Sequence, residues 1–285
     1  HLGNFTLPFS VFLYYHKQTG LVYLDVIGYL ENYYNNYDEE GRLLSNHGKV
    51  EFLTTMRYIE KYLFTGARIL EIGAGTGRYS LTLANQGYTV DAVELIQHNI
   101  DIFKGNISPD INVTVQKGNA TDLSFIEDNV YDITLLLGPM YHLFTGNDKI
   151  KALSEALRVT KKRGLLFTAY CISDGSVICY GFRQGNIDTL VDKGLLDIET
   201  FKAFSTPEEI FELYRKEDID ELMKRFEVSR LHYVATDLAT NFMRDTIDSM
   251  DEELFKIYLK YHFSICERSD MVGVTHHSLD IVRKS

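Results

Sequence analysis

Residues 71–77 read Glu-Ile-Gly-Ala-Gly-Thr-Gly and are the part of the sequence best suited to hold a charged ligand. Glycine has no Cβ, so the alternating glycines let the backbone turn sharply and approach a ligand closely. A helix is expected from Tyr79, and the free N–H groups at a helix start attract a carboxylate or a phosphate. The pattern predicts a ligand-binding turn at Gly73–Gly77 with an acid, Glu71, beside it.

The spacing of these glycines distinguishes two kinds of nucleotide-binding turn. A dinucleotide fingerprint reads G-x-G-x-x-G, and its third glycine would fall at Arg78. The observed G-x-G-x-G therefore disfavours a nicotinamide cofactor. A second acid, Glu94, ends the next expected strand. Its carboxylate has the geometry to accept hydrogen bonds from both hydroxyls of a ribose.

This combination resembles motif I of the class I S-adenosylmethionine-dependent methyltransferases, of the branch that acts on small molecules. The resemblance implies S-adenosylmethionine as the cofactor, with Glu71 near the amino end of its methionine part and Glu94 at its ribose. It covers roughly residues 50–172. The cofactor-binding residues that it implies are Glu71, Gly73, Ala74, Gly75, Gly77, Glu94, Leu95, Asn119, Ala120 and Leu137.

The resemblance extends to two later segments. Residues 118–123 are similar to the family's Gly-Asp-Ala run, which contacts the adenine, but Asn119 stands where the family has Asp. The side-chain carbonyl of an Asn can still accept from the adenine amino group, and Asp122 is the alternative. Residues 137–143, which end the fourth expected strand, occupy the position that faces the transferred methyl group in the family.

Methyl transfer from a sulfonium needs in-line alignment of the nucleophile and exclusion of water. A base is needed only if the nucleophile arrives protonated. His142 is the predicted base, because it follows the fourth strand near the crevice where such folds bind ligands. The alternative is a histidine that hydrogen-bonds a loop. Tyr141 is predicted to shape the acceptor pocket or to stack on the acceptor.

Three further groups of residues bear on the site. The segment with Tyr33, Tyr34, Tyr37 and Arg42 is a candidate lid over the cofactor, and ordinary packing is the alternative. The motif Asn/Asp-Pro-Pro-Tyr/Phe is absent, which disfavours methylation of adenine N6 or glutamine N5. No metal is predicted, because the adjacent residues 276–277 would point to opposite faces of a strand.

The elements that must position these residues alternate along the chain. Strands are predicted at 67–72, 88–94, 112–116, 131–137, 165–172, 226–236 and 274–283, and helices at 51–63, 79–86, 96–104 and 148–163. Strands that alternate with helices form parallel βαβ units. The predicted fold class is therefore α/β, a doubly wound, mostly parallel, seven-stranded Rossmann-like sheet with helical cap insertions.

The predicted domain boundaries are the points where the alternation of strands and helices begins and ends. Residues 1–50 are predicted to be an N-terminal extension or lid, and residues 51–285 a methyltransferase domain. Cap insertions are predicted at about 173–205 and 237–270, packed against each other. Gly164 is predicted to cap the helix over 148–163. The sequence Thr-Pro-Glu-Glu at 206–209 predicts another helix start.

Composition limits the partners. The chain has 29 Lys and Arg against 40 Asp and Glu, a formal net charge of −11. This charge disfavours nucleic acid, whose phosphates require clustered cations. The three cysteines form no C-x-x-C pair, which predicts reduced thiols and a cytoplasmic location. The apolar stretch at 7–15 lacks the basic segment of a signal peptide, and no apolar run is long enough to span a membrane.

The resulting hypothesis is a methyltransferase, monomeric or homodimeric, that transfers a methyl group to a small molecule. Three alternatives stay open at this point: methylation of RNA or protein, a protein that binds S-adenosylmethionine without catalysis, and an NAD-dependent oxidoreductase. The acceptor and the methylated atom are not encoded in any motif of the sequence.

Overall fold

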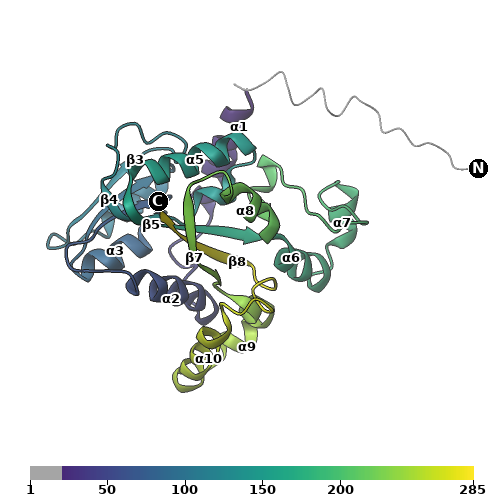
Figure 1. Cartoon of the computed structure of the whole chain (residues 1–285). Helices are drawn as coiled ribbons and strands as arrows, with labels where there is room; N and C mark the ends of the chain where they lie inside the picture. The colour runs from purple at the N-terminus through teal and green to yellow at the C-terminus, as the bar shows by residue number, and fades with distance from the viewer. Residues whose placement is uncertain (1–20) are drawn as a thin grey trace, which may run out of the picture.

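The computed structural model describes residues 21–285 and arranges them around a central sheet (Figure 1). The strands are β1 (Arg68–Ile72), β2 (Thr89–Glu94), β3 (Val113–Lys117), β4 (Tyr131–Leu136), β5 (Thr160–Ile172), β6 (Leu213–Tyr214), β7 (Val228–Ala235) and β8 (His277–Lys284). The α-helices are α1 (Leu21–Asn36), α2 (Asn46–Glu60), α3 (Arg78–Asn85), α4 (Gln97–Gly105), α5 (Gly146–Val159), α6 (Ser173–Ser176), α7 (Ile187–Asp192), α8 (Lys216–Met223), α9 (Arg244–Asp248) and α10 (Glu252–Ile265). Shorter helical turns of other types span Pro139–His142, Val177–Arg183, Pro207–Glu209 and Leu238–Met243.

The sheet confirms the predicted fold class and adds one short strand to it. The strand order is β3-β2-β1-β4-β5-β8-β7, and the two-residue β6 pairs with β5, so the sheet has eight strands. Strands β1 to β5 are joined in parallel, whereas β8 is antiparallel to both β5 and β7. The predicted apolar stretch at 7–15 lies outside the described residues.

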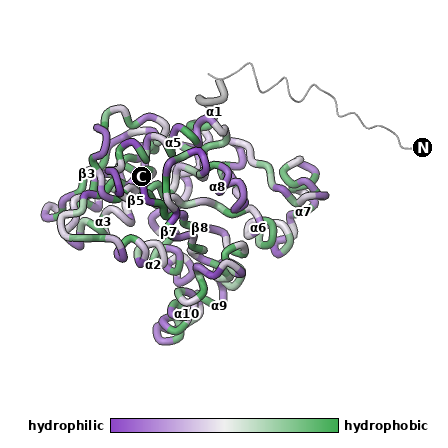
Figure 2. The backbone as a smooth tube through the Cα atoms, in the orientation of Figure 1, coloured by the Kyte–Doolittle hydropathy of each residue, from purple (hydrophilic) through white to green (hydrophobic). Residues whose placement is uncertain are grey.

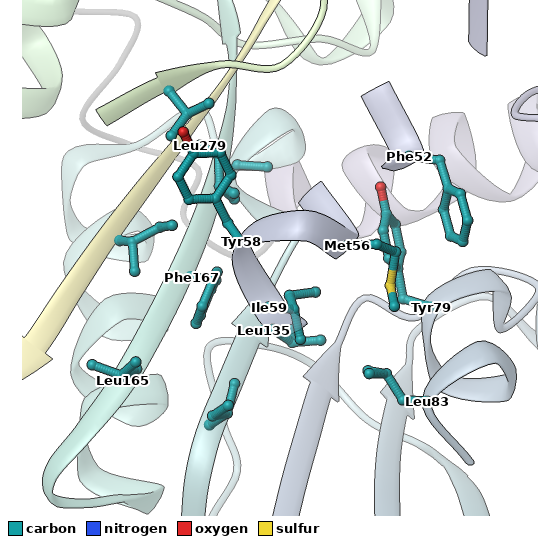
Figure 3. Close-up of a cluster of buried hydrophobic side chains, with 14 of the residues drawn as sticks. Phe52, Met56, Tyr58, Ile59, Tyr79, Leu83, Leu135, Leu165, Phe167 and Leu279 are labelled. Atoms are coloured by element: carbon teal, nitrogen blue, oxygen red, sulfur yellow. The ribbon is translucent and has the colours of Figure 1, made fainter. Parts of the chain in front are cut away.

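Two apolar layers hold the helices against the sheet. On one face, Met56 and Ile59 of α2 lie over Leu135 of β4 and Phe167 of β5 (Figure 3). The other face is covered by α5 and α8. Burying a side chain such as Ile59 stabilises the fold by roughly 1.5–3 kcal/mol. Helices at the outside, such as α10, carry both hydrophilic and hydrophobic residues (Figure 2). No helix among residues 21–285 is long and apolar enough to cross a membrane.

The helix predicted over 148–163 ends earlier than expected. Helix α5 stops at Val159, and the residues from Thr160 onward already belong to β5. The amine of Lys161 lies 2.8 Å from a carboxylate oxygen of Asp132 at the start of β4, which draws this segment alongside the sheet. A Cβ on Gly164 would lie 3.0 Å from the carbonyl oxygen of Asp132. The predicted helix cap at Gly164 was wrong, and this glycine instead permits a close approach of the strands.

The helix predicted to start at Thr206 is a single turn, Pro207–Glu209. The hydroxyl of Thr206 donates to the Glu208 carboxylate (2.9 Å) and makes no side-chain cap to the backbone. Ile210 then adopts a φ of 70°, which a helix does not allow. The predicted helix start is therefore present, but the helix does not continue, because the segment forms part of the cavity wall in an irregular conformation.

The two segments predicted to be cap insertions contact each other, and their role as a cap stays a prediction. In the first insertion, the guanidinium of Arg183 donates to the backbone carbonyl of Asn241 in the second (3.1 Å). The thiol of Cys179 approaches the same carbonyl at 3.9 Å. The first insertion is built from α6, the turn at 177–183 and α7, and the second mainly from α9 and α10. The division of the chain at residue 50 stays an interpretation.

The antiparallel strand β8 brings distant segments to one edge of the sheet. In its register with β5, Cys171 pairs with His277, so β8 begins where β5 ends. Strand β7 ends at the same edge, because Ala235 pairs with Ser278. The carboxyl ends of β1, β4, β5 and β7 and the first residue of β8 therefore lie along the same edge of the sheet. This edge is the place where doubly wound folds bind ligands.

Replacing Gly77 by Ala is expected to destabilise the fold more than replacing Gly87 by Ala. Both glycines have positive φ, 89° and 90°, which costs a residue with a Cβ about 1–2 kcal/mol. A Cβ on Gly77 would also lie 2.5 Å from the Phe103 ring, whereas nothing lies within 4 Å at Gly87. We expect this overlap to add about 1–3 kcal/mol. Urea unfolding of both variants measures the difference, and equal losses would contradict the packing role of Gly77.

Candidate functional site

A large cavity opens at the carboxyl edge of the sheet. Its volume is about 1350 Å³, above the roughly 300–1000 Å³ of ordinary ligand pockets. Its walls come from α1, α2, the turn after β1, the ends of β2 and β4, and the segments that follow β3, β5 and β7. The cavity therefore has room for a cofactor and an acceptor side by side.

The residues predicted to bind the cofactor line this cavity, with one exception. Those in its wall are Glu71, Gly73, Ala74, Gly75, Glu94, Leu95, Asn119, Ala120 and Leu137. Gly77 is not in the wall: it precedes the first residue of α3 and packs against Phe103. Both predicted catalytic residues, Tyr141 and His142, line the cavity.

The glycine turn has the open backbone that a bound ligand requires. Gly73 and Gly75 have φ values of 74° and 54°, which favour glycine. A Cβ on Gly73 would lie 2.5 Å from the Pro139 ring, so the turn packs directly on the segment after β4. At Gly75 the nearest atom would be Glu39 Cγ, at 3.7 Å. The backbone is thus bare on the cavity side, which fits the approach of a methionine moiety.

Glu94 joins the end of β2 to the glycine turn. One carboxylate oxygen accepts from the backbone N–H of Gly75 (2.8 Å) and the other from that of Ile96 (2.8 Å). Burial raises the pKa of Glu94, and these hydrogen bonds oppose the shift. The oxygen bonded to Ile96 also accepts from the side-chain amide of Asn99 (3.4 Å). A carboxylate has about four acceptor positions, so the oxygen bonded to Gly75 is the one that can still take a hydrogen bond from a hydroxyl. This arrangement fits the ribose of a nucleoside.

Glu71 is almost completely buried behind the turn. It accepts hydrogen bonds from the backbone N–H (2.9 Å) and from the hydroxyl of Ser80. Burial raises the pKa of Glu71 to about 8, with a smaller contribution from the negative charge of Glu94. The carboxyl group is therefore mostly protonated at neutral pH in the absence of a ligand. A cationic ammonium beside it would favour the ionised form.

Only one of the two adenine candidates lines the cavity. Asn119 is in the wall, and its side-chain oxygen accepts from the backbone N–H and the hydroxyl of Thr121, both at 3.0 Å. Asp122 is exposed and accepts from the backbone of Ser124 (3.1 Å). Asn119 is therefore the candidate that faces the cavity, but both acceptor positions of its side-chain carbonyl are taken by Thr121, so the bond to the adenine amino group stays a prediction.

His142 is held at both ring nitrogens. Nδ1 lies 2.9 Å from the backbone carbonyl of Ile210, and Nε2 lies 2.9 Å from the hydroxyl of Tyr34. A carbonyl only accepts, so Nδ1 carries the proton and the Tyr34 hydroxyl donates to Nε2. Burial lowers the pKa of His142 to about 4, so the ring is neutral. Its role as a base stays a prediction, and that role requires Tyr34 to release Nε2.

The tyrosines of the predicted lid also line the cavity. Tyr33 stacks on Tyr37, with ring centroids 5.0 Å apart, and meets the ring of Phe211 edge-on at 5.7 Å. Tyr34 is bonded to His142 as described. Helix α1 therefore contacts the segment around residue 211, and a lid role for it stays a prediction.

Arg42, assigned to the lid from the sequence, holds two acids on the cavity wall. Its guanidinium donates to Glu39 (3.1 Å) and to Glu51 (2.9 Å). The two anions keep the pKa of Arg42 above its usual value, despite burial. Arg42 therefore remains charged and links α2 to the segment after α1.

Sequence reasoning missed a cluster formed by Glu51, Asp237 and His277. His277 Nδ1 lies 2.7 Å from an Asp237 carboxylate oxygen and 3.6 Å from one of Glu51. All three residues line the cavity. From the sequence, His276 and His277 were considered only as two possible ligands of one metal ion. A usable signal was the position of Asp237 directly after one expected strand and of His277 near the start of the next.

The middle of the chain matches a known family. The family model described as "Methyltransferase domain" matches residues 69–164, from β1 into β5. The demethylmenaquinone methyltransferase of Clavibacter sepedonicus is 31% identical over 129 residues, which are 45% of this chain and 50% of that protein. The chain spans about half the length of the first curated relatives that it matches.

Solved structures show the same fold over more of the chain. A methyltransferase of Thermotoga maritima, described as a possible histamine N-methyltransferase, aligns with a TM-score of 0.55 and 18% identity, covering 90% of this chain and 99% of that one. Phosphoethanolamine N-methyltransferase 1 of Haemonchus contortus, solved with S-adenosylhomocysteine, gives a TM-score of 0.58 and 14% identity, covering 92% of this chain and 49% of that one. Residues 69–164 therefore match a methyltransferase domain, and the solved methyltransferase structures share the fold over most of the chain.

Proposed function

We propose that this protein transfers the methyl group of S-adenosylmethionine to a small-molecule acceptor by in-line displacement. The observation that carries the proposal is the glycine turn with Glu94 bonded to Gly75, opening into a cavity larger than one ligand needs. When bound, S-adenosylmethionine supplies an electrophilic methyl carbon. The protein's part is to align the acceptor and to exclude water.

The residues divide between these tasks. Glu94 and Asn119 would hold the ribose and the adenine, while Glu71 and the glycine turn would hold the methionine part. Tyr141 and the tyrosines of α1 form the apolar wall that would exclude water. Several relatives are named for small-molecule acceptors, such as the demethylmenaquinone and phosphoethanolamine methyltransferases. Those names and the acidic charge support a small acceptor over RNA or protein.

Replacing Glu94 by Ala is expected to weaken S-adenosylmethionine binding by about 1–3 kcal/mol, which is roughly 5- to 150-fold. The change removes the ribose acceptor and leaves the Gly75 N–H without its partner. Titration calorimetry measures the affinity directly. The exposed Glu127 lies outside the cavity, and Glu127→Ala is the matched control. Equal affinities of both variants would refute the ribose assignment.

Binding of S-adenosylmethionine at pH 6.5 is expected to release a proton from Glu71. The free carboxyl group has a pKa of about 8, and an ammonium placed beside it lowers that pKa. Affinity should therefore rise with pH towards 8, by up to about tenfold per unit. Calorimetry in two buffers of different ionisation enthalpy counts the protons. Glu71→Gln should abolish the release, and a wild-type protein that releases none would contradict the proposed role.

His142→Ala and Tyr34→Phe together test the predicted base. If His142 takes a proton from the acceptor, its removal lowers kcat by about 10²–10⁴-fold. Tyr34→Phe would then keep the rate or raise it, because it frees Nε2. If His142 only anchors α1, both variants should lower the rate to a similar extent. Initial rates are measured with the best acceptor from a panel of phenols, thiols and primary amines.

A further inference from the structure

We propose that Asp237 and His277, with Glu51 beside them, form a general base in the acceptor part of the cavity. The acceptor class is then one whose nucleophile arrives with a proton: a phenol or other hydroxyl, a thiol, or an ammonium. This inference rests on the proposed methyl transfer and names His277 as the general base of that reaction. It is an alternative to the base predicted at His142, because the acceptor gives up only one proton.

The topology of the sheet places this pair at the ligand edge. Asp237 lies two residues beyond the end of β7, and His277 is the first residue of β8. Both strands reach the edge where β5 ends at Cys171 and Ile172. The two residues come from the part of the chain beyond the family match, so the common cofactor-binding core does not account for them.

Asp237 is held rigidly and holds His277 in turn. It is 1% exposed, and one of its carboxylate oxygens accepts from the backbone N–H of His276 (2.9 Å), that of His277 (3.2 Å) and the hydroxyl of Thr275 (2.5 Å). The other oxygen accepts from the side-chain amide of Asn241 (2.5 Å) and from His277 Nδ1 (2.7 Å). The carboxylate has no proton to give, because these donors and His277 hold the pKa of Asp237 below its usual range despite burial.

This bond fixes the tautomer of the imidazole. The Nδ1–H donates to the carboxylate, so Nε2 is the nitrogen that would act on a ligand, and its side-chain neighbour is the thiol of Cys171. An acid that orients a histidine and stabilises its imidazolium is the arrangement that serves a general base in hydrolases. His142 differs, because its Nε2 is already occupied by the Tyr34 hydroxyl.

The charges around His277 favour its protonated form. The groups that face it or its partners are Glu51 and Arg42 from the N-terminal side, Tyr141 after β4, Cys171 at the end of β5, and Asp237, Arg244 and His276. Burial lowers the pKa of His277, but Glu51 and Asp237 outweigh it and raise the pKa well above the usual value. The neutral ring, which forms only above this raised pKa, is therefore a stronger base than an ordinary histidine.

The proposed step balances in atoms and charge. Nε2 takes the proton of the acceptor's X–H group as X bonds to the methyl carbon. The carbon–sulfur bond breaks, and its electron pair stays on sulfur, which becomes the neutral thioether of S-adenosylhomocysteine. His277 leaves the step as an imidazolium paired with Asp237, and it then loses the proton to water.

The first test needs no acceptor. Long-range ¹H–¹⁵N NMR of histidine-labelled protein with S-adenosylhomocysteine bound should show His277 as the Nδ1–H tautomer at high pH. Its pKa should lie above 6.5, and Glu51→Gln should lower it, because that change removes one of the two acids that raise it. An Nε2–H tautomer, or a pKa that Glu51→Gln leaves unchanged, would overturn the proposal.

The second test uses rates with the best acceptor of the panel. His277→Gln should lower kcat by about 10²–10⁴-fold and leave S-adenosylmethionine affinity unchanged in calorimetry. The exposed His98→Gln is the control for loss of a histidine. Wild-type kcat should rise with pH through the pKa of His277, and Glu51→Gln should move this rise to lower pH. A merely structural role would not move the profile.

The remaining outcomes also decide the question. If the His277→Gln variant has the same kcat as the wild type, His277 is not the general base. Activity lost with EDTA and restored by Mn²⁺ would do the same, because Glu51, Asp237 and His277 would then be metal ligands. A wild-type protein that fails to bind S-adenosylmethionine in calorimetry would refute the proposed function instead, and the NMR experiment would still report on the pair.

Discussion

The hydrogen bond between the Glu94 carboxylate and the Gly75 backbone N–H is the contact on which the cofactor end of the cavity depends. It fixes the end of β2 against the turn that follows β1, so an acid and a bare backbone face the same space. Both partners require special residues: Gly75 has a φ of 54°, and Glu94 is a buried acid. The bond and the parallel register of β1 with β2 hold these residues where a nucleoside could meet both.

The second constraint is the cost of placing charges in a partly buried cavity. An isolated buried ion is costly unless it is paired or hydrogen-bonded. Here Arg42 pairs with Glu39 and Glu51, and Asp237 pairs with His277. Glu71 has no cation beside it and is instead driven towards its neutral form. The cavity wall thus contains both fixed charges and one group that a cationic ligand can ionise.

The sequence predicted the fold, and nine of the ten predicted cofactor-binding residues line one cavity, because both depend on local patterns. Alternating apolar strands define the parallel sheet, and a glycine turn with acids on consecutive strands is readable from spacing alone. It failed where tertiary contacts override local signals. Gly164 looks like a helix cap but serves strand packing beside Asp132. The capping signal at Thr206 yields only one turn, because the chain there forms part of the cavity wall.

The acceptor end was not predictable in the same way, since its residues are brought together only by the order of the strands. Glu51 lies on a helix before β1, and Asp237 and His277 lie 40 residues apart after the family core. Asp237 and His277 come together only because β8 is inserted antiparallel between β5 and β7. The same insertion brings residues beyond the family match to the cavity wall. The glycine turn and Glu94 thus lie within the matched residues 69–164, whereas the proposed acceptor base, Asp237 and His277, depends on the later strands β7 and β8.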